Sequence, residues 1–371
     1  MEILLGAPAC LTPLGPDLPT TLAAMRAGTS ALLPSPFPGS EKPVHVGRVD
    51  DVWLTGSGRR SQRMIGRVVR HTLTRLTRNL RTEPRTCFIL ATTKGDVKAL
   101  EQGRPEDTML PVFAARMGAA QGFSGQPIVV SSACISGTLA IKFAADLIAL
   151  GEFDHALVVG FDEASDFVLS GFLALHAMAT EGCEPFDDAR DGISLGEASA
   201  SVVLSRDRSL FQEGAVAEYV GGGMGNDANH ISGPSRTGEG LVRAVEAALD
   251  SAGLTASDVG HVNAHGTGSV YNDGMEAIAF GRLGLGHAPV NSYKGYFGHT
   301  LGTAGLVEAL IAVEALRQGI LLRSLGATNT TAMPDMDILK ENRDTSRDLL
   351  LKTSSGFGGC NAAVLLRALR S

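Results

Sequence analysis

The sequence predicts an α/β protein built around a mostly parallel β-sheet with helices on both faces. Two observations lead to this prediction. Strand-like and helix-like segments alternate along most of the chain, and 45 glycines are available for the tight turns between them. At 371 residues the chain is long enough to bury a sizeable apolar core, as one large unit or as about two or three domains.

The first half of the chain alternates in this way from an arginine-rich segment onward. Residues 57–83 carry eight arginines among apolar residues, at a spacing that fits an amphipathic helix. Three apolar segments are typical of buried strands, at 87–93, 126–134 and 155–161. An apolar helix is expected at 135–150, directly after the second of these strands. The runs 199–205 and 215–221 are expected to form an antiparallel pair because only a charged turn separates them.

The second half repeats the alternation of strands and helices. Helices are expected at 238–253, 273–284 and 303–319. Strands are expected at 261–268, 289–297, 348–357 and 361–369. We therefore expect an internal duplication, with an N-terminal half at 1–206 and a C-terminal half at 207–371.

Composition narrows the class of protein. The net charge of −7 gives no basic domain of the kind that nucleic-acid binding requires. The five cysteines are scattered and form no CxxC pair, so neither a metal site nor a disulfide framework is expected. No run of about 18 apolar residues occurs, so no membrane span is expected. The sequence predicts a cytoplasmic protein.

Cys134 lies between an apolar strand and an apolar helix, in the segment SSACISG. A thiol at a helix N-terminus faces the positive end of the helix dipole and unsatisfied N–H groups, which favour the thiolate. Its small neighbours leave room for a substrate, and backbone N–H groups at such a turn can hold an oxyanion. A buried structural cysteine is the competing interpretation, and this segment alone does not separate the two.

Two histidines lie at the ends of predicted strands, His265 in AHGTG and His299 in FGHTLG. The carboxyl ends of parallel strands meet at one edge of a sheet, where α/β proteins place their sites. Taken singly, each histidine would more often be structural. Together with a cysteine that accepts an acyl group, however, two neutral imidazoles could stabilise an enolate and complete a carbon–carbon bond-forming site.

Five segments, in order and spacing, resemble the elongating β-ketoacyl synthases of the thiolase superfamily: SSACISG, PFDDARDGISLGEASASVVL, AHGTGSVYNDGMEA, SYKGYFGHTLGTAGLVEA and SSGFGGCNAAVLL. The resemblance covers the chain from about residue 87 to the end. It implies a thiolase-like α/β fold, in which two duplicated βαβαβαββ halves form a five-layered α-β-α-β-α arrangement. It also implies a decarboxylating Claisen condensation without a cofactor, on substrates carried by the phosphopantetheine arm of an acyl carrier protein.

The resemblance implies a role for each matching residue. Cys134 matches the acyl-accepting nucleophile, and His265 and His299 match the pair that assists decarboxylation and condensation. Lys294 matches a lysine near the site, and Phe357 a gating aromatic whose backbone N–H completes the oxyanion hole. Substrate contacts are implied for Thr267, Ser269 and Gly358, and structural support for Asp227, Glu276 and Glu308, the last as the ion-pair partner of Lys294.

Alternatives stay open at this point. A thiolase acting on coenzyme A thioesters would use a second cysteine, which Cys360 could supply, although the synthases tolerate small residues there. A catalytically silent partner subunit of a ketosynthase heterodimer would lack the nucleophile that matches Cys134. The initiating synthases carry Asn where His299 stands. A hydrolase-type elbow at Ser132 or Ser136 lacks the flanking glycine motif.

The chain also departs from the elongating synthases. The segment before Cys134, which usually helps to form the dimer and the acyl pocket, is shorter than in most of them. The wording of GISLGEASAS and KGYFGHTLG looks more like the synthases of aryl-polyene and related pigment pathways. Because such enzymes often pair with a related subunit, we expect either a homodimer or a heterodimer.

Carrier-protein docking calls for a local basic patch, because acyl carrier proteins are acidic and this chain is acidic too. The start of the arginine-rich helix is the candidate, with Arg59, Arg60, Arg63 and Arg67. Such a patch would steer encounter in a salt-dependent manner. A solvated amphipathic face is the competing interpretation.

Overall fold

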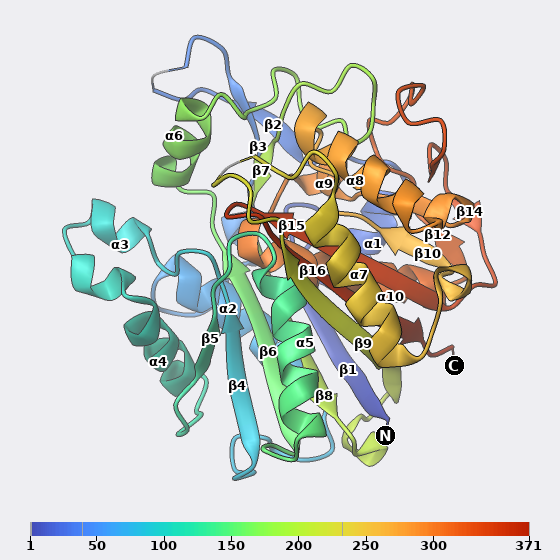
Figure 1. Ribbon diagram of the computed structural model, residues 1–371. Coiled ribbons are helices and arrows are strands. Elements are labelled where there is room, and N and C mark those ends of the chain that lie inside the picture. The colour runs from blue at the N-terminus through green and yellow to red at the C-terminus, as the bar shows by residue number, and fades with distance from the viewer. Residues whose placement is uncertain (1, 39, 232, 371) are drawn as a thin grey trace.

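The computed structural model describes residues 2–38, 40–231 and 233–370, which surround a mixed sheet of 11 strands (Figure 1). In chain order these strands are β1 (Ile3–Leu11), β4 (Thr86–Ala91), β5 (Ile128–Val130), β6 (His155–Asp162), β8 (Ala198–Ser205), β9 (Ala215–Asn226), β10 (His261–Asn263), β11 (Pro289–Asn291), β13 (Asp337–Ile338), β15 (Leu349–Gly356) and β16 (Cys360–Ala368). Across the sheet they lie in the order β13-β11-β10-β15-β16-β9-β1-β8-β6-β4-β5.

The remaining elements lie around this sheet. The short strands are β2 (Leu32–Ser35), β3 (Val44–Gly47) and β7 (Leu195–Gly196) in one small sheet, and β12 (Ile320–Leu321) and β14 (Arg343–Asp344) in another. The α-helices of the described residues are α1 (Leu18–Arg26), α2 (Arg60–Leu73), α3 (Lys98–Glu101), α4 (Leu110–Ala120), α5 (Ser136–Ala149), α6 (Asp166–Ala174), α7 (Glu239–Ala252), α8 (Val270–Arg282), α9 (Lys294–Phe297) and α10 (Ala304–Arg317).

The two halves of the sheet share one topology. Taken in sheet order, β5, β4, β6, β8 and β1 are the third, second, fourth, fifth and first main strands of their half, and β11, β10, β15, β16 and β9 repeat that order. In each half the first three of these strands run parallel, and the last two are antiparallel to their neighbours. The predicted duplication is confirmed, while the boundary between 206 and 207 stays a prediction.

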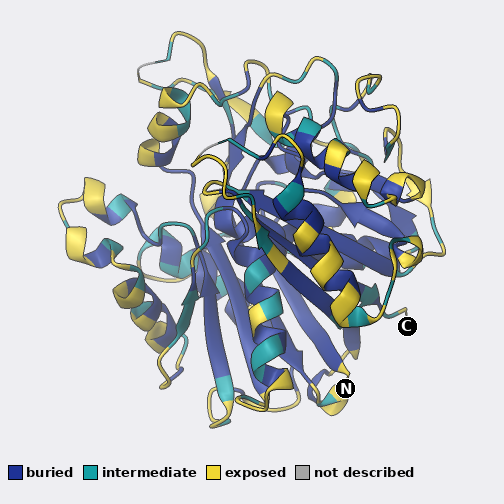
Figure 2. Cartoon of the chain, viewed as in Figure 1, coloured by how far each residue is buried: buried dark blue, intermediate teal, exposed yellow. Residues whose placement is uncertain are grey.

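The layers follow from where the apolar side chains are buried. Helices α5 and α10 lie together in the central layer, and one apolar cluster joins them to β1, β4, β6, β15 and β16. A second cluster joins α2 and α4 to the outer face of the N-terminal strands, and a third joins α7 and α8 to the C-terminal strands. Figure 2 shows buried strands through the middle and exposed outer sides on α7 and α8. The five-layered thiolase-like arrangement predicted from the resemblance is therefore confirmed.

Glycine allows the two central helices to approach closely. A Cβ atom on Gly305 would lie 2.1 Å from the hydroxyl oxygen of Thr138, and one on Gly137 would lie 2.6 Å from the backbone nitrogen of Leu306. Such distances are far inside van der Waals contact, so neither position accepts a side chain without movement of a helix. This contact fixes α5, which begins two residues after Cys134, against α10.

The predicted pairing of 199–205 with 215–221 is wrong. Strand β1 lies between β8 and β9 and is hydrogen-bonded to both, so these two segments do not touch as neighbours. The N-terminal ILLGAPACL forms the unpredicted strand β1, and all of its residues are buried. Because β1 takes the position between β8 and β9, the partners of these two strands become clear only from the three-dimensional structure.

Several predicted elements are shorter in the structure. The helix expected within 57–83 spans only Arg60–Leu73. The strand expected at 261–268 ends at Asn263, and the strand expected at 289–297 ends at Asn291, where a loop and α9 take over. The catalytic-type histidines therefore lie in loops after strand ends. Among the described residues, no helix is both long and apolar enough to cross a membrane.

Candidate active site

Cys134 lies at the tight turn between β5 and α5. Ala133, directly before it, has a positive φ of 43°, a left-handed conformation that costs energy for a residue with a side chain. The hydroxyl of Ser136 stabilises this turn, because it donates to the Ala133 carbonyl at 2.7 Å and accepts the Ser132 N–H at 2.9 Å. As a result Cys134 points into the protein and is only 8% exposed.

The structure brings Cys134, His265 and His299 together, as the sequence predicts. Their sulfur and imidazole nitrogen atoms all lie within 4.8 Å of one another. The two imidazole rings meet edge to face, with centroids 5.0 Å apart and an interplanar angle of 82°. All three side chains line a single cavity of about 430 Å³, so one small group could contact the sulfur and both rings.

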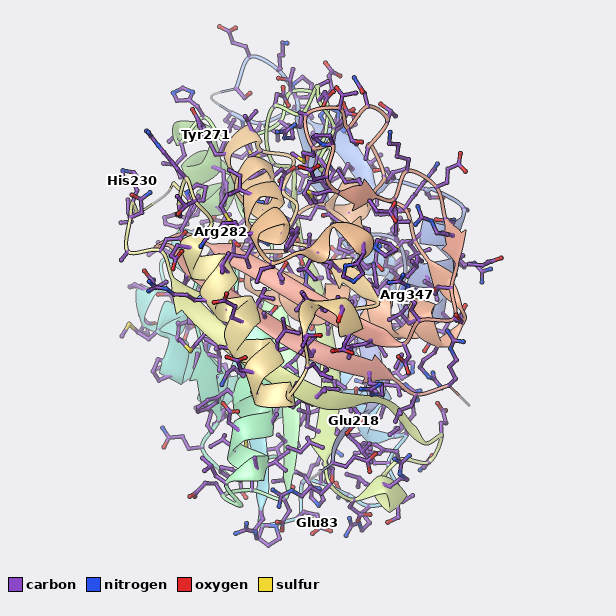
Figure 3. All side chains as sticks on the ribbon, turned by 45° about the vertical axis from the view of Figure 1, so that its right-hand side comes forward. Glu83, Glu218, His230, Tyr271, Arg282 and Arg347 are labelled. Carbon is purple, nitrogen blue, oxygen red and sulfur yellow. The ribbon has the colours of Figure 1, made fainter. Side chains whose placement is uncertain are left out.

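The cavity opens between the loop after β9 and the start of α8. His230 and Tyr271, from these two elements, line it and lie on the same side of the molecule (Figure 3). Tyr271 is 80% exposed, and Val270 beside it is 55% exposed. The cavity therefore has an entrance with apolar side chains and a floor that carries the thiol and the imidazoles.

Two buried carboxylates hold the loop that carries His265. Glu276 on α8 accepts the backbone N–H of His265 at 2.8 Å and that of Gly266 at 2.6 Å. Asp273, one turn earlier, accepts the N–H groups of Thr267 and Gly268 at 2.9 and 3.1 Å. Four consecutive N–H groups are thus fixed by side chains. These contacts support a structural role for Glu276, which stays a prediction, and they add Asp273, whose sequence context did not reveal it.

His299 is fixed through its backbone. Its N–H donates to the Ser194 carbonyl at 2.7 Å, and its own carbonyl accepts the Gly196 N–H at 2.9 Å. Gly298 before it has a φ of +81°, and a Cβ atom there would lie 2.5 Å from the carbonyl oxygen of Leu195. The short strand β7 therefore sets the position of this imidazole, and only glycine fits the approach.

Burial controls the protonation of the trio. It lowers the pKa of both imidazoles well below the ordinary value, and Lys294 lowers both further, so both rings are neutral at physiological pH. Within the described part of the chain, Nδ1 of His265 and both ring nitrogens of His299 have no hydrogen-bond partner. Neutral imidazoles with unused nitrogens in a cavity are suited to donate hydrogen bonds to a developing oxyanion.

The thiol departs from the expectation based on the helix dipole. Burial raises the pKa of Cys134 to about 12, and the opposing effects of Lys294 and the Phe357 N–H do not overcome it. The isolated cavity therefore favours the thiol over the thiolate. The proton must leave the sulfur during its reaction, and the neighbouring imidazoles are the bases within reach.

Lys294 and Glu308 form the expected ion pair, and a second lysine, Lys352, also pairs with Glu308. The Lys294 ammonium lies 2.8 Å from Oε1 of Glu308, and the Lys352 ammonium lies 2.5 Å from Oε2 of the same carboxylate. All three side chains have no exposed surface. Burial would raise the pKa of Glu308, but the two lysines outweigh it and lower that pKa. Lys352 was missed because it stands in the apolar run of β15.

Phe357 stands beside the nucleophile, as expected. Its backbone N–H acts to lower the pKa of the Cys134 thiol, so it faces the sulfur as an oxyanion hole at this point requires. Its ring stacks on Phe172 with centroids 5.7 Å apart, and it is 37% exposed. Gly358 follows with a φ of +83°, which lets the chain turn sharply after the ring.

The remaining expected residues lie around the same cavity. Thr267 and Ser269 line it, and their hydroxyl oxygens are 2.9 Å apart. Asp227 accepts the backbone N–H groups of Ser235 and Gly240 at 3.0 and 2.8 Å, which is the structural role expected for it. Cys360 is part-buried and is not among the residues that line the cavity; its sulfur lies 3.2 Å from the Phe357 carbonyl oxygen and 3.8 Å from that of Ser132.

The arginines expected to dock a carrier protein have partners within the chain. Arg60 contacts Glu197 at 2.6 Å and Glu163 at 3.3 Å, and Arg59 contacts Asp96 at 3.3 Å. Arg63 and Arg67 donate to backbone carbonyls near the start of the chain and near Trp53. These contacts assign Arg59 and Arg60 an internal ion-pairing role that the sequence analysis missed. Carrier docking through them is an untested prediction that the pairing does not favour.

Comparisons with known proteins agree with this geometry. A model of the β-ketoacyl synthase N-terminal domain matches residues 79–209, and a model of its C-terminal domain matches 216–328. The 3-oxoacyl-[acyl-carrier-protein] synthase 2 of Vibrio cholerae is 33% identical over 277 residues, covering 71% of this chain and 67% of that protein. The enzyme of the same name from Rhizobium meliloti is 37% identical over 253 residues, covering 64% and 60%. The matched region thus spans only about 60 to 67% of these relatives.

Solved structures match over the whole chain. A β-ketoacyl synthase from Burkholderia phymatum has a TM-score of 0.89 at 25% identity, covering 100% of both chains. A complex of a ketosynthase with its chain length factor from Xenorhabdus doucetiae gives a TM-score of 0.88 at 25% identity, covering 99% and 98%. With both domain models matched over most of its length, this chain belongs to the β-ketoacyl synthase family, as its motifs indicated.

Proposed function

We propose that this chain is a β-ketoacyl synthase that transfers an acyl group to Cys134 and condenses it with a malonyl unit. The observation that carries the proposal is the shared cavity, in which a buried thiol and two neutral imidazoles lie within 4.8 Å of one another. In this set the thiol is the nucleophile, and the two imidazoles serve as the base and as hydrogen-bond donors.

The first step is acyl transfer. The Cys134 sulfur attacks the carbonyl carbon of an acyl thioester while an adjacent imidazole takes the thiol proton. The oxygen of the tetrahedral intermediate accepts hydrogen bonds from the backbone N–H groups of Phe357 and Cys134. The carrier thiol then leaves with the proton, and the acyl group remains on Cys134.

The second step is the condensation. The malonyl thioester loses carbon dioxide, and the resulting enolate oxygen accepts hydrogen bonds from His265 and His299. Because both rings are buried and neutral, they donate without carrying a charge that would hold the carboxylate in place. The enolate carbon attacks the acyl carbonyl, the carbon–sulfur bond breaks, and the lengthened β-ketoacyl chain stays on the carrier.

Substrates would enter on a phosphopantetheine arm, with no other cofactor. Thr267 and Ser269 present hydroxyl groups along the cavity, which suits an extended arm with amide groups. Gly358 does not line the cavity, and its N–H and carbonyl are bonded to Ile231 and Asn226, so a substrate contact at Gly358 stays a prediction. An acyl carrier protein is therefore the proposed partner. The Xenorhabdus doucetiae ketosynthase is in complex with its chain length factor, which supports a related second subunit for this chain. Fatty-acid, pigment or polyketide synthesis is the proposed context.

Intact mass after mixing with acyl carrier thioesters tests the proposal. We expect one acyl group per chain in the natural protein and none in Cys134→Ala. A silent partner subunit would stay unmodified in both. A thiolase would instead accept acetyl-coenzyme A and release no carbon dioxide. Preincubation with a chelator, with no loss of acylation expected, tests the expectation that no metal takes part.

A further inference from the structure

We propose that Lys352 is a positioning residue for the condensation, which fixes the backbone of His265 and adds a positive charge facing the histidine pair. The inference rests on the proposed function, because the condensation it refers to is the proposed reaction. It is drawn from the buried cluster of Lys294, Lys352 and Glu308, which the motifs did not reveal.

The contacts of Lys352 lead directly to His265. Its ammonium donates to the Ala264 carbonyl at 3.2 Å, and the Lys294 ammonium donates to the next carbonyl, that of His265, at 2.5 Å. Glu308 bridges the two ammoniums from α10. On the other side of the same loop, Glu276 holds the His265 N–H. Groups on β15, α8, α9 and α10 thus hold the backbone of two adjacent residues, Ala264 and His265.

Lys352 is not needed to neutralise Glu308. Lys294 already supplies one positive charge to that carboxylate, so the second lysine leaves the cluster with an excess of one. Burying an ammonium is costly, and an apolar side chain of the same volume would fit the run of β15 better. We therefore infer that Lys352 has a role besides its ion pair with Glu308.

The surplus charge faces the imidazoles. Lys352 and Lys294 both act to lower the pKa of His265 and of His299, after the larger effect of burial. Lys94, from the loop after β4, acts on His299 in the same direction. The charged groups around the pair are therefore those three lysines together with the carboxyls of Glu308, Glu276 and Asp162, the last of which is fully buried and pairs with Lys94 at 2.8 Å. Burial lowers the pKa of Lys352 itself to about 8, so its charge is present at neutral pH.

The variant Lys352→Met tests this role, because Met keeps the volume and leaves Glu308 paired with Lys294. Removing a nearby cation raises the pKa of both imidazoles, so each ring protonates at a higher pH. We expect the acid limb of the condensation pH profile to move up by about one pH unit, with about a tenfold loss below the limb and little change above it. Lys352→Arg, which restores the charge, should move the limb back.

Two controls separate this role from simpler ones. Lys142→Met removes a part-buried lysine of α5 that pairs with Asp146 and should leave the profile unchanged. Histidine imidazole titration by NMR reports the two pKa values directly and needs no substrate, so it tests the inference even if the proposed function is wrong. Should Lys352→Met not fold, Lys352→Gln allows the same comparison.

A folded Lys352 variant with unchanged imidazole pKa values and an unchanged acid limb would overturn the inference, and Lys352 would then be only a brace. Absence of acylation in the natural protein would instead contradict the proposed function.

Discussion

At the residue scale, the cavity depends on one thiol and two rings that the sequence identifies and on groups that it does not. Cys134, His265 and His299 follow strand ends in recognisable motifs, so their meeting could be predicted. The roles of Lys352 and Asp273 could not be predicted, because neither lies in a recognisable motif and each role depends on buried partners that only the structure shows. The raised pKa of Cys134 was also missed, since burial is a property of the folded chain.

The two histidines should matter for condensation more than for acylation. For the single variants His265→Ala and His299→Ala we expect acyl transfer to Cys134 to continue, because the other imidazole can still take the thiol proton, and the condensation rate to fall by about 10² to 10⁴. The physical reason is the loss of hydrogen bonds to the enolate oxygen. Single-turnover assays that follow acyl-enzyme and product separately measure this, and equal losses in both steps would argue against the assigned roles.

Cys360 offers a matched cysteine for the nucleophile. Because its sulfur contacts the Phe357 carbonyl and is not part of the trio, Cys360→Ala should keep acylation and condensation within about threefold of the natural protein. Activity assays on Cys360→Ala beside Cys134→Ala measure this. Loss of activity in Cys360→Ala would revive the thiolase interpretation.

At the scale of elements, periodicity identified the strands and helices of the main sheet but not their ends or partners. The helix at 135–150 agrees with α5 to within about one residue at each end, because its apolar face and Gly151 mark it clearly. The pairing of β8 with β9 failed because β1, from the far end of the chain, lies between them. Sequence order does not reveal such insertions.

The contact between α5 and α10 predicts a large effect of a small side chain. Gly305→Ala should lower the free energy of unfolding by about 1–3 kcal/mol, because the new methyl group would overlap the Thr138 hydroxyl. Gly281→Ala in α8 is the matched control, since a Cβ atom there meets nothing within 4 Å, and it should stabilise by about 0.5–1 kcal/mol. Denaturant unfolding measures both. Equal effects of the two substitutions would refute the close helix contact.

At the scale of the whole molecule, the duplicated topology brings the two halves of the site together. The N-terminal half supplies Cys134 and the C-terminal half supplies both histidines, and the central helices lock the halves in place. The resemblance to a duplicated fold therefore predicted the overall arrangement well. Composition predicted little of it, since the net charge of −7 says nothing of the internal ion pairs that hold Arg59 and Arg60.

The free energy of unfolding should depend on pH through one buried carboxyl, that of Glu276. Burial, followed by Asp273, raises the pKa of Glu276 from 4.5 to about 7. The native protein therefore holds a proton that the unfolded chain releases, so this contribution is complete below pH 4.5 and is lost as the pH rises through 7. Glu276→Gln should flatten the pH dependence of the unfolding free energy in this window by about 3 kcal/mol. Denaturant titrations at several pH values measure it, and parallel curves for both proteins would contradict it.

A pulse-chase measurement of the acyl-enzyme tests the central claim most directly. The protein is first acylated from an acyl carrier thioester, freed of excess substrate, and then mixed with malonyl carrier protein while the mass of the Cys134 peptide and the released carbon dioxide are followed. We expect the acyl group to leave Cys134 as carbon dioxide appears, with one lengthened β-ketoacyl carrier formed per acyl group lost. An acyl group on any residue other than Cys134, or one that stays on Cys134 when the malonyl carrier is added, would contradict a condensation carried out by this cavity.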